Sequence, residues 1–445
     1  MRVVKIQGDF RAKAIAGTHV VLIALDCAEA YRHNLMWFAF KRETTGAASS
    51  KWLRSLKVFR SVVPDPKNER DPRDPNKPKR FDTSEHPIQS FLWGDYTAVP
   101  DTLYKFTIVP MFGRPGALQP QPGLEFEIRT EKEFDQSHGI WFNRGAIASQ
   151  AFEREFENKA PPDPDNPNSP ETVWLSRGLL EACLRYINET PKGDGLRVAA
   201  YEFTYKPVLD ALKTALDRGV DVQIVYHDTT NETGSGNGAN ENAIKTAGLP
   251  QKANGVQVLF PRSKTKIPHN KFIIRLKNGT EPTLVWTGST NFTPSGFLGQ
   301  TNVGHLIEDS ATAEKFLTFW ELLKTDPNRK TARDGVMQLT PNPPALIPAN
   351  SFVTIFSPRP KSELLKWYGD RIKDATGTVM FTAAFGVTKE LVGPLTEDRD
   401  FLRFVLMEKP PTKEVKVNST NGCWRRITTG TKVKALYSSC IPSSC

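Results

Sequence analysis

Short apolar runs separated by polar, turn-rich segments fill the first part of the chain, a pattern typical of β-strands. The clearest runs lie at residues 19–25, 36–40, 104–109 and 124–128. Runs of this length with turns between them favour an all-β arrangement, because each run is long enough to cross a sheet once. We therefore expect residues 1–158 to form a β-sandwich-like domain, interrupted by a polar, mobile insertion at residues 64–80.

The pattern changes after a break rich in proline, aspartate and asparagine at residues 161–170. Beyond this break, residues 196–203 are expected to form a strand, residues 207–218 a helix and residues 220–226 a second strand. Strands that alternate with helices indicate a layered α/β domain. We place this domain at residues 171–325.

The order of strand, helix and strand recurs near the end of the chain. A strand beginning at residue 377, a helix at residues 389–394 and a strand at residues 401–407 repeat the earlier order. We therefore expect a partial second α/β half at residues 350–411. The predicted fold class is α+β and multidomain, with a β-sandwich-like domain, an α/β layered domain and a partial second repeat.

The last segment, residues 412–445, loses apolar periodicity and is rich in serine, threonine and cysteine, so we expect an irregular tail. Two explanations fit this tail. Either an unrelated end has replaced the rest of the second half, or the chain is a natural short form with a disordered terminus. Translation of the other reading frames beyond residue 412 would distinguish them.

Composition limits the class of protein without selecting a partner. The chain has 445 residues, of which 38% are hydrophobic, and a formal net charge of +10. These values indicate a folded protein that can attract nucleic acid or anionic lipid.

No run approaches the ~20 apolar residues of a membrane span, and the N-terminus lacks a signal-peptide core, so we expect a cytoplasmic protein. Cys423, Cys440 and Cys445 have no accompanying histidine, and we expect neither a metal site nor a cofactor.

The strongest chemical pattern is His269 with Lys271, followed about one strand later by Ser289 with Asn291. Successive side chains of a strand point to opposite faces, so the members of each pair are expected to share a face. A short polar turn at residues 277–280 predicts that the two strands are neighbours. An imidazole, an ammonium, a hydroxyl and an amide would then converge on one place, and this set can hold a phosphodiester.

Each of these residue types suits a step of phosphodiester chemistry. Imidazole is mostly neutral near pH 7 and can attack phosphorus or act as a general acid without a metal, which is the role we assign to His269. Lys271 would supply positive charge, and Asn291 amide donors, to the oxygens on which negative charge accumulates. Ser289 would add a hydroxyl donor. An isolated H-x-K is more often an ordinary strand, and the second motif at this distance favours the functional interpretation.

The motifs H-N-K at residues 269–271 and G-S-T-N-F-T at residues 288–293 resemble the H-x-K and G-S-x-N-F pair of the phospholipase D superfamily. The similarity runs from about residue 174 to residue 320. It implies a hydrolase that forms a phosphohistidine on the H-x-K histidine, while a second histidine protonates the leaving alcohol. By this resemblance His269, Lys271 and Asn291 are catalytic and Ser289 binds the substrate.

The chain departs from the family pattern at several points. Leu276 stands where the pattern H-x-K-x-x-x-x-D has an aspartate. The segment after the second motif lacks an orienting carboxylate, and Asn302 is the residue there that could bind a ring nitrogen. No second H-x-K occurs after Trp320. A symmetric homodimer would bring two copies of His269 together, although the begun second half should occupy the face that such a dimer uses.

Basic residues crowd around His269 and would attract an anionic substrate. We assign Lys266 and Arg275 among them to substrate binding, the alternative being a solvated basic surface. Three functions then stay open. The first is a metal-independent phosphodiesterase that cleaves a phospholipid or nucleic acid. The second is a catalytically weak protein that binds phosphate, lipid or nucleic acid, and the third is a phosphatidyl transferase, in which an alcohol replaces water.

Overall fold

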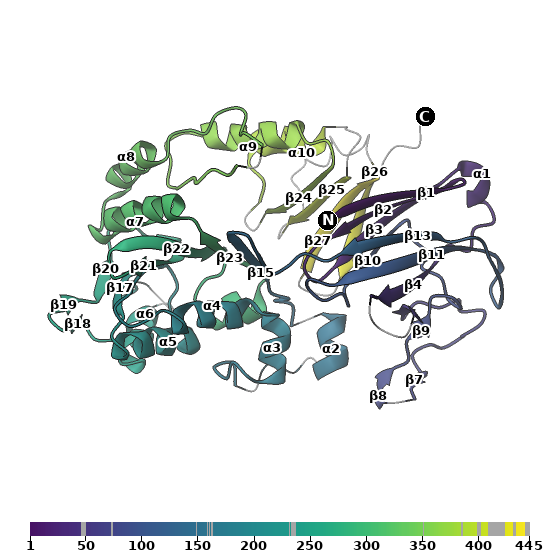
Figure 1. Cartoon of the computed structure of the whole chain (residues 1–445), viewed down its shortest axis with the longest axis horizontal. Helices are drawn as coiled ribbons and strands as arrows, with labels where there is room; N and C mark the ends of the chain where they lie inside the picture. The colour runs from purple at the N-terminus through teal and green to yellow at the C-terminus, as the bar shows by residue number, and fades with distance from the viewer. Residues whose placement is uncertain are drawn as a thin grey trace. The chain divides into compact units, whose positions relative to one another are not determined.

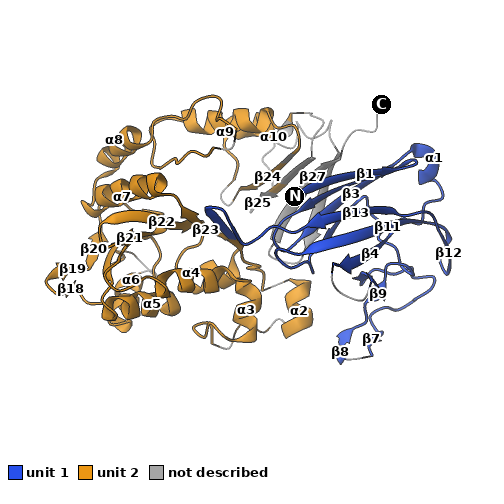
Figure 2. Ribbon diagram, viewed as in Figure 1, with its two compact units in different colours: residues 1–140 blue, residues 141–445 orange. Residues whose placement is uncertain are grey.

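The computed structural model describes most of the chain (Figure 1). The described residues are 1–45, 50–72, 74–147, 149–157, 159, 161, 163–230, 232, 237–349, 351–383, 386–397, 402–407, 423–429 and 433–440. The chain divides into two compact units, Met1–Ile140 and Trp141–Cys445 (Figure 2). This division lies within strand β15 (His138–Phe142), earlier than the boundary near residue 158 that the sequence suggested.

Unit 1 is built mainly of antiparallel sheets. One sheet has the order β1 (Arg2–Gln7), β2 (Phe10–Ala16), β3 (Val21–Cys27) and β10 (Leu92–Asp95). The other has the order β12 (Ala117–Pro120), β11 (Leu103–Arg114), β4 (Phe38–Thr44) and β5 (Lys51–Trp52), and β13 (Leu124–Arg129) also pairs with β11. The apolar runs of the sequence coincide with β3, β4, β11 and β13.

Alternation along these strands builds a shared core. In β3, Val21, Ile23 and Leu25 are buried while the residues between them are less so. They belong to the same apolar cluster as Phe40 of β4 and Phe106 of β11. The two sheets therefore pack on one another through the faces that the period of two makes apolar.

Short elements complete unit 1. They are α1 (Glu29–Arg32), β6 (Arg54–Ser55), β7 (Arg70–Asp71), β8 (Asp74–Pro78), β9 (Phe81–Asp82) and β14 (Phe134–Asp135). Strand β7 pairs with β8. The polar segment 64–80, expected to be a mobile insertion, therefore contains a short hairpin.

The sheet that carries both motif strands has the order β14-β15-β23-β22-β21-β16-β17-β20. The bounds of its strands in unit 2 are β16 (Gly195–Ala200), β17 (Asp221–His227), β20 (Leu259–Arg262), β21 (Lys271–Lys277), β22 (Glu281–Gly288) and β23 (Val303–Glu308). Strand β17 is parallel to β16 and to β20, whereas β21 is antiparallel to β16 and to β22. The motif strands β21 and β22 are thus neighbours, as the turn between them predicted.

Helices cover both faces of this sheet (Figure 1). Helices α4 (Leu179–Asn188) and α5 (Lys206–Asp217) share one apolar cluster with Leu196 and Val198 of β16. Helix α7 (Ser310–Lys324) shares another with Ala199 of the same strand. A strand that is buried on both faces explains why residues 196–200 form a continuous apolar run instead of an alternating one, apart from Arg197.

The remaining elements of this part of the chain connect the layers. They are α2 (Gln150–Phe156), α3 (Pro170–Ser176), α6 (Ala239–Thr246), β18 (Lys252–Ala253), β19 (Val256–Gln257), a π-helical turn (Ser295–Gly299) and α8 (Arg329–Leu339). Within the described ranges, no helix has both the length and the apolar character needed to cross a membrane.

The order of elements in the first half recurs at the end of the chain. Helix α9 (Glu363–Lys373), β24 (Thr378–Ala383), α10 (Lys389–Thr396) and β25 (Leu402–Met407) follow one another as α4, β16, α5 and β17 do. Strands β24 and β25 are parallel, as β16 and β17 are. The predicted strand, helix and strand are therefore present here.

The segment expected to be an irregular tail contains two strands. They are β26 (Cys423–Thr429) and β27 (Val433–Cys440), which pair with each other and extend the sheet to the order β24-β25-β27-β26. The other residues after 407 lie outside the described part. The expectation of an irregular tail was wrong for these strands, because backbone pairing between neighbouring strands can form a ladder without an apolar run.

Candidate active site

The candidate site lies at one edge of the unit 2 sheet, where several strands begin or end. His269 comes just before β21, while Tyr201 and Glu202 follow directly after β16. Because β21 runs antiparallel to β16, its beginning lies beside the end of β16, and the Tyr201 amide donates a hydrogen bond to the Asn270 carbonyl at 2.8 Å. His227 ends the parallel strand β17, so it reaches the same edge.

His269 and Lys271 form the closest pair of reactive groups at this edge. The Lys271 Nζ lies 3.0 Å from the His269 Nδ1 and 3.0 Å from the His269 carbonyl oxygen. Lys271 is buried, and this burial lowers its pKa to about 8 against the opposing effect of the Glu202 carboxylate. Near pH 7 the ammonium form therefore still predominates.

The same surroundings favour a neutral imidazole on His269. Partial burial lowers the pKa of His269, the Lys271 charge lowers it further, and Glu202 acts in the opposite direction. An ammonium can only donate hydrogen bonds, so the ring nitrogen that faces it must accept. The Nδ1 lone pair is thus occupied by Lys271, and the proton of the neutral ring lies on Nε2. A phosphate that draws the ammonium toward its own oxygens would release Nδ1.

The second motif begins where β22 ends at Gly288. The Ser289 hydroxyl donates to the Asn302 Oδ1 at 2.8 Å and accepts from the Val303 amide at 3.1 Å. The Asn291 amide nitrogen donates to the Glu202 carboxylate, while the Asn291 Oδ1 is buried without a hydrogen-bond partner. The two arms of the site therefore meet through Glu202 and Asn291.

Backbone contacts fix these arms to each other. Phe203 and Phe292 form a parallel β-bridge, and their rings lie 6.2 Å apart. The amides of Thr204 and Tyr205 both donate to the Phe292 carbonyl, at 2.9 and 2.8 Å. The segment after β16 is consequently hydrogen-bonded to the segment after β22, although the two segments are far apart in the sequence.

Asn302 and Arg275, which the sequence assigned to the site, do not contact His269 in the structure. Asn302 does not orient His269 in this structure, because both ends of its side-chain amide have other partners. Its Oδ1 accepts from the Ser289 hydroxyl, and its Nδ2 donates to the Gly296 carbonyl at 2.8 Å. Arg275 lies toward the other end of β21, about 13 Å along the strand from Lys271 by the usual rise per residue. There its Nε donates to the Asp194 carboxylate at 3.0 Å. The substrate-binding assignment of Arg275 is therefore not supported by its position.

Lys266 and Leu276, the two other positions singled out in the sequence, lie in different surroundings. Lys266 is exposed on the loop that leads to His269. Leu276, which replaces the family's aspartate, is buried in the apolar cluster of helix α7. A carboxylate at that position would have to be desolvated among Phe272 and Val285, so its absence fits the packing.

Sequence reasoning missed an aromatic group beside His269. The Tyr201 ring lies 4.9 Å from the His269 ring, edge to face, and 5.2 Å from the His227 ring, on which it stacks. The His227 Nδ1 lies 3.6 Å from the Glu232 carboxylate, and burial lowers the pKa of His227 despite that carboxylate. His227 is a second histidine at this edge, but Tyr201 stands between it and His269 in the strand order.

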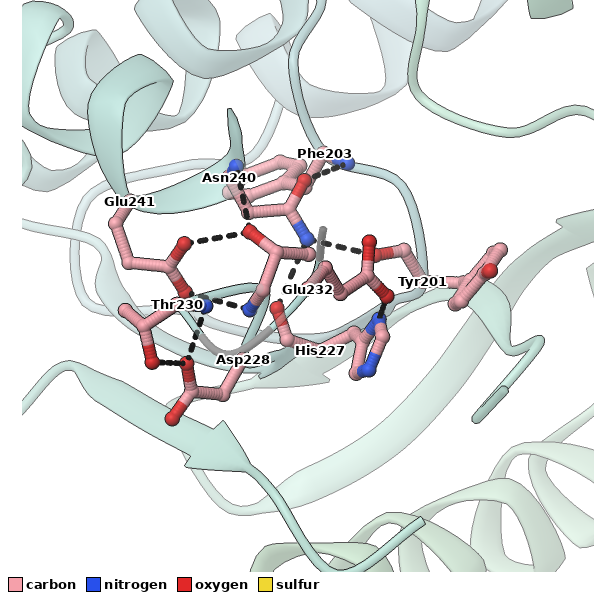
Figure 3. Close-up of polar contacts among 9 residues, drawn as sticks. Tyr201, Phe203, His227, Asp228, Thr230, Glu232, Asn240 and Glu241 are labelled. Atoms are coloured by element: carbon pink, nitrogen blue, oxygen red, sulfur yellow. Dashed lines mark hydrogen bonds and ion pairs between the residues drawn. The ribbon is translucent and has the colours of Figure 1, made fainter. Parts of the chain in front are cut away.

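A buried asparagine holds the ends of β16 and β17 together (Figure 3). The Asn240 amide nitrogen donates to the Tyr201 carbonyl at 2.8 Å and to the His227 carbonyl at 2.9 Å. Its Oδ1 accepts from the Phe203 amide at 2.8 Å. Nothing in the sequence indicated this role, because the three partners are 13 to 39 residues away along the chain.

Metal-ligating side chains do not gather at this edge or elsewhere in the described ranges: no group of three or more histidine, cysteine, aspartate or glutamate residues could hold an ion there.

Comparison with known proteins gives a matching family model and several similar solved structures. A family model described as cardiolipin synthase, PLD-like domain, matches residues 184–323. Nuc from Salmonella typhimurium, a phospholipase D family member, is 32% identical, covering 32% of this chain and 83% of its own, with a TM-score of 0.25. NucT from Helicobacter pylori is 18% identical, covering 42% and 97%, with a TM-score of 0.28.

The phosphatidylserine synthase of Haemophilus influenzae Rd KW20 is 12% identical, covering 49% of this chain and 56% of its own, with a TM-score of 0.35. A search of curated proteins gave no match. The assignment rests on the family model and on the identity to Nuc over most of its length, since all three TM-scores are low. The chain belongs to the phospholipase D superfamily. The matched residues include both phospholipase D motifs, at residues 269–271 and 288–293.

Gly288, the first residue of the second motif, should be intolerant of a side chain. Its φ is +146°, and an added Cβ would lie 2.1 Å from the Val303 carbonyl oxygen. We expect Gly288→Ala to reduce the free energy of unfolding by about 1–3 kcal/mol, because the backbone must shift. Urea denaturation would measure this. Gly299→Ala, with its nearest contact at 3.8 Å, is the control, and equal stability of the two variants would contradict the prediction.

Asn240→Ala should both destabilise unit 2 and disturb the site. It leaves the amide of Phe203 and the carbonyls of Tyr201 and His227 without their buried partner. We expect a loss of about 2–4 kcal/mol in the free energy of unfolding. The exposed Asn242→Ala should change it by less than about 0.5 kcal/mol. A loss for Asn240→Ala no larger than this control would show that the network is not needed for stability.

Proposed function

We propose that this phospholipase D-like chain is a phosphodiesterase that attacks phosphorus with His269 and uses no metal ion. The observation that carries the proposal is the contact of the Lys271 ammonium with the His269 ring at 3.0 Å, beside the second motif arm that bears Ser289 and Asn291. Phosphoryl transfer requires a nucleophile with a cation and hydrogen-bond donors nearby, and the two motifs supply these groups.

The reaction would proceed in two displacements. In the first, a ring nitrogen of His269 forms a bond to phosphorus while the bond from phosphorus to the leaving oxygen breaks. Lys271 and Asn291 donate to the non-bridging oxygens, on which negative charge concentrates. In the second, a water oxygen bonds to phosphorus as the nitrogen–phosphorus bond breaks, and the water proton passes to solvent. The products are a phosphomonoester and an alcohol.

The leaving oxygen needs a proton unless it departs as a stable anion. His227 is the other histidine at this edge, and the Tyr201 ring lies against both histidines, so His227 does not offer a direct proton path to a phosphate bound at His269. Water would then protonate the leaving oxygen, and substrates with acidic leaving groups should react fastest. A homodimer would supply a second His269, and we propose it as the form able to cleave alkyl phosphodiesters.

Hydrolysis of an aryl phosphodiester by the purified chain tests the proposal. We expect turnover in the presence of a chelator and a loss of at least about a thousandfold in His269→Ala, because no other group can take over the attack. The exposed His33→Ala, located in unit 1, is the matched control and should retain wild-type activity. Loss of wild-type turnover on chelation, or equal activity of His269→Ala and wild type, would contradict histidine chemistry without a metal.

The pH profile of kcat/KM should have two limbs set by the free protein. As the pH rises, activity should increase when His269 loses its proton. This limb should lie below the usual imidazole pKa, because burial lowers the pKa of His269. Activity should fall as Lys271 loses its proton near its pKa of about 8, since the neutral amine no longer attracts phosphate. In Lys271→Arg the guanidinium stays charged, so the alkaline limb should disappear from this range. An unchanged alkaline limb in that variant would assign it to another group.

A further inference from the structure

Formation of a phosphohistidine creates an electrostatic problem at this site. As the His269 nitrogen bonds to phosphorus, the imidazole ring becomes positively charged. The Lys271 ammonium lies 3.0 Å from the same ring and opposes that charge. A negative group nearby would relieve the conflict, and neither Asn302 nor the buried Leu276 can provide one.

Glu202 brings a carboxylate to this place from a different element. It follows β16 directly and accepts a hydrogen bond from the Asn291 amide nitrogen. The bridge between Phe203 and Phe292 and the hydrogen bonds from Thr204 and Tyr205 to the Phe292 carbonyl fix both backbones beside this contact. The fold therefore places the two backbones side by side, and the side-chain contact between Asn291 and Glu202 is exposed to solvent.

The contact also determines which way the Asn291 amide points. Its nitrogen faces the carboxylate, and its oxygen is buried without a partner. Rotating the amide by half a turn would place the Oδ1 against a carboxylate oxygen, which has no proton to donate. The contact with the Glu202 carboxylate thus keeps the Asn291 amide nitrogen, and not its oxygen, directed to this part of the site.

Among the charged groups of the described residues that act on His269, Glu202 is the one that favours a positive ring. Lys271 opposes it, whereas Glu202 raises the pKa of both His269 and Lys271. Tyr201 is neutral against the ring, and beyond it lie His227 and Glu232. On the β20 side, the Arg262 guanidinium donates to the Asn270 Oδ1 at 3.3 Å and lies 4.0 Å from the Asp326 carboxylate.

We propose that Glu202 is a positioning residue of the active site, which orients the Asn291 amide and offsets the positive charge that His269 acquires when it bonds to phosphorus. The part of this proposal that concerns phosphorus rests on the proposed function. The part that concerns the orientation and charge of the free site does not, so the two can be tested separately.

Glu202→Gln removes the charge while keeping a side chain of the same size. Titration of histidine ring resonances by NMR, assigned through His269→Ala, would follow His269 without any need for turnover. We expect the His269 pKa to fall in Glu202→Gln, because a neighbouring negative charge that favours the imidazolium is lost. Glu281→Gln, an exposed change at the beginning of β22, should leave it unchanged.

Kinetics test the second part of the proposal with the same variants. In Glu202→Gln we expect kcat/KM for an aryl phosphodiester to fall about tenfold at neutral pH, and both limbs of its pH profile to move to lower pH. A merely structural role would lower activity without moving both limbs in one direction. Glu202→Asp keeps the charge and should restore part of the lost activity.

The possible outcomes are distinct. A lowered His269 pKa in Glu202→Gln without turnover in wild type would support the placement of Glu202 and reject the proposed phosphodiesterase. An unchanged His269 pKa in a folded Glu202→Gln variant would overturn the proposal, whatever the activity. Turnover of Glu202→Gln equal to wild type at every pH would do the same.

Discussion

The close approach of Lys271 to His269 is the constraint on which the rest of the site depends. If both groups were charged at 3.0 Å, their repulsion would be about 5.5 kcal/mol at an effective dielectric constant of 20. This is far above thermal energy, so one of the pair must be neutral at rest. Burial lowers the pKa of both, but the lysine starts some four units higher, so the ring is the group that loses its proton. The pair is thereby divided into a neutral nucleophile and a cationic donor.

The sheet topology makes this pairing possible. Parallel strands β16 and β17 direct their carboxyl ends, with Tyr201, Glu202 and His227, to one edge, and the antiparallel β21 begins at that edge with His269. Loops at the carboxyl ends of parallel strands are the usual place for binding groups in α/β sheets. Here the Asn240 network and the Phe203–Phe292 bridge hold those ends in register, so that residues 89 positions apart, Glu202 and Asn291, can share a hydrogen bond.

The sequence predicted those parts of the structure that depend on local periodicity. The strand, helix and strand order of β16, α5 and β17, its recurrence in β24, α10 and β25, and the pairing of β21 with β22 all follow from apolar patterns and one turn. The order of β21, β16 and β17 across the sheet did not follow, because strand order is a long-range property. For that reason Glu202, Tyr201 and His227 were missed, and Arg275 was placed too near His269 although it pairs with Asp194.

Charge balance explains why a carboxylate can belong to a site for an anion. With His269 neutral, the Lys271 ammonium and the Glu202 carboxylate cancel, so the free site has little net charge of its own. A phosphodiester then brings one negative charge, and the ring gains one positive charge when it bonds to phosphorus. The sum of charges stays near zero if Glu202 is present and becomes positive if it is not. Attraction of the substrate from a distance then falls to exposed cations such as Lys266, whereas Lys271 and Glu202, which contact His269 and Asn291, are arranged for the reaction itself.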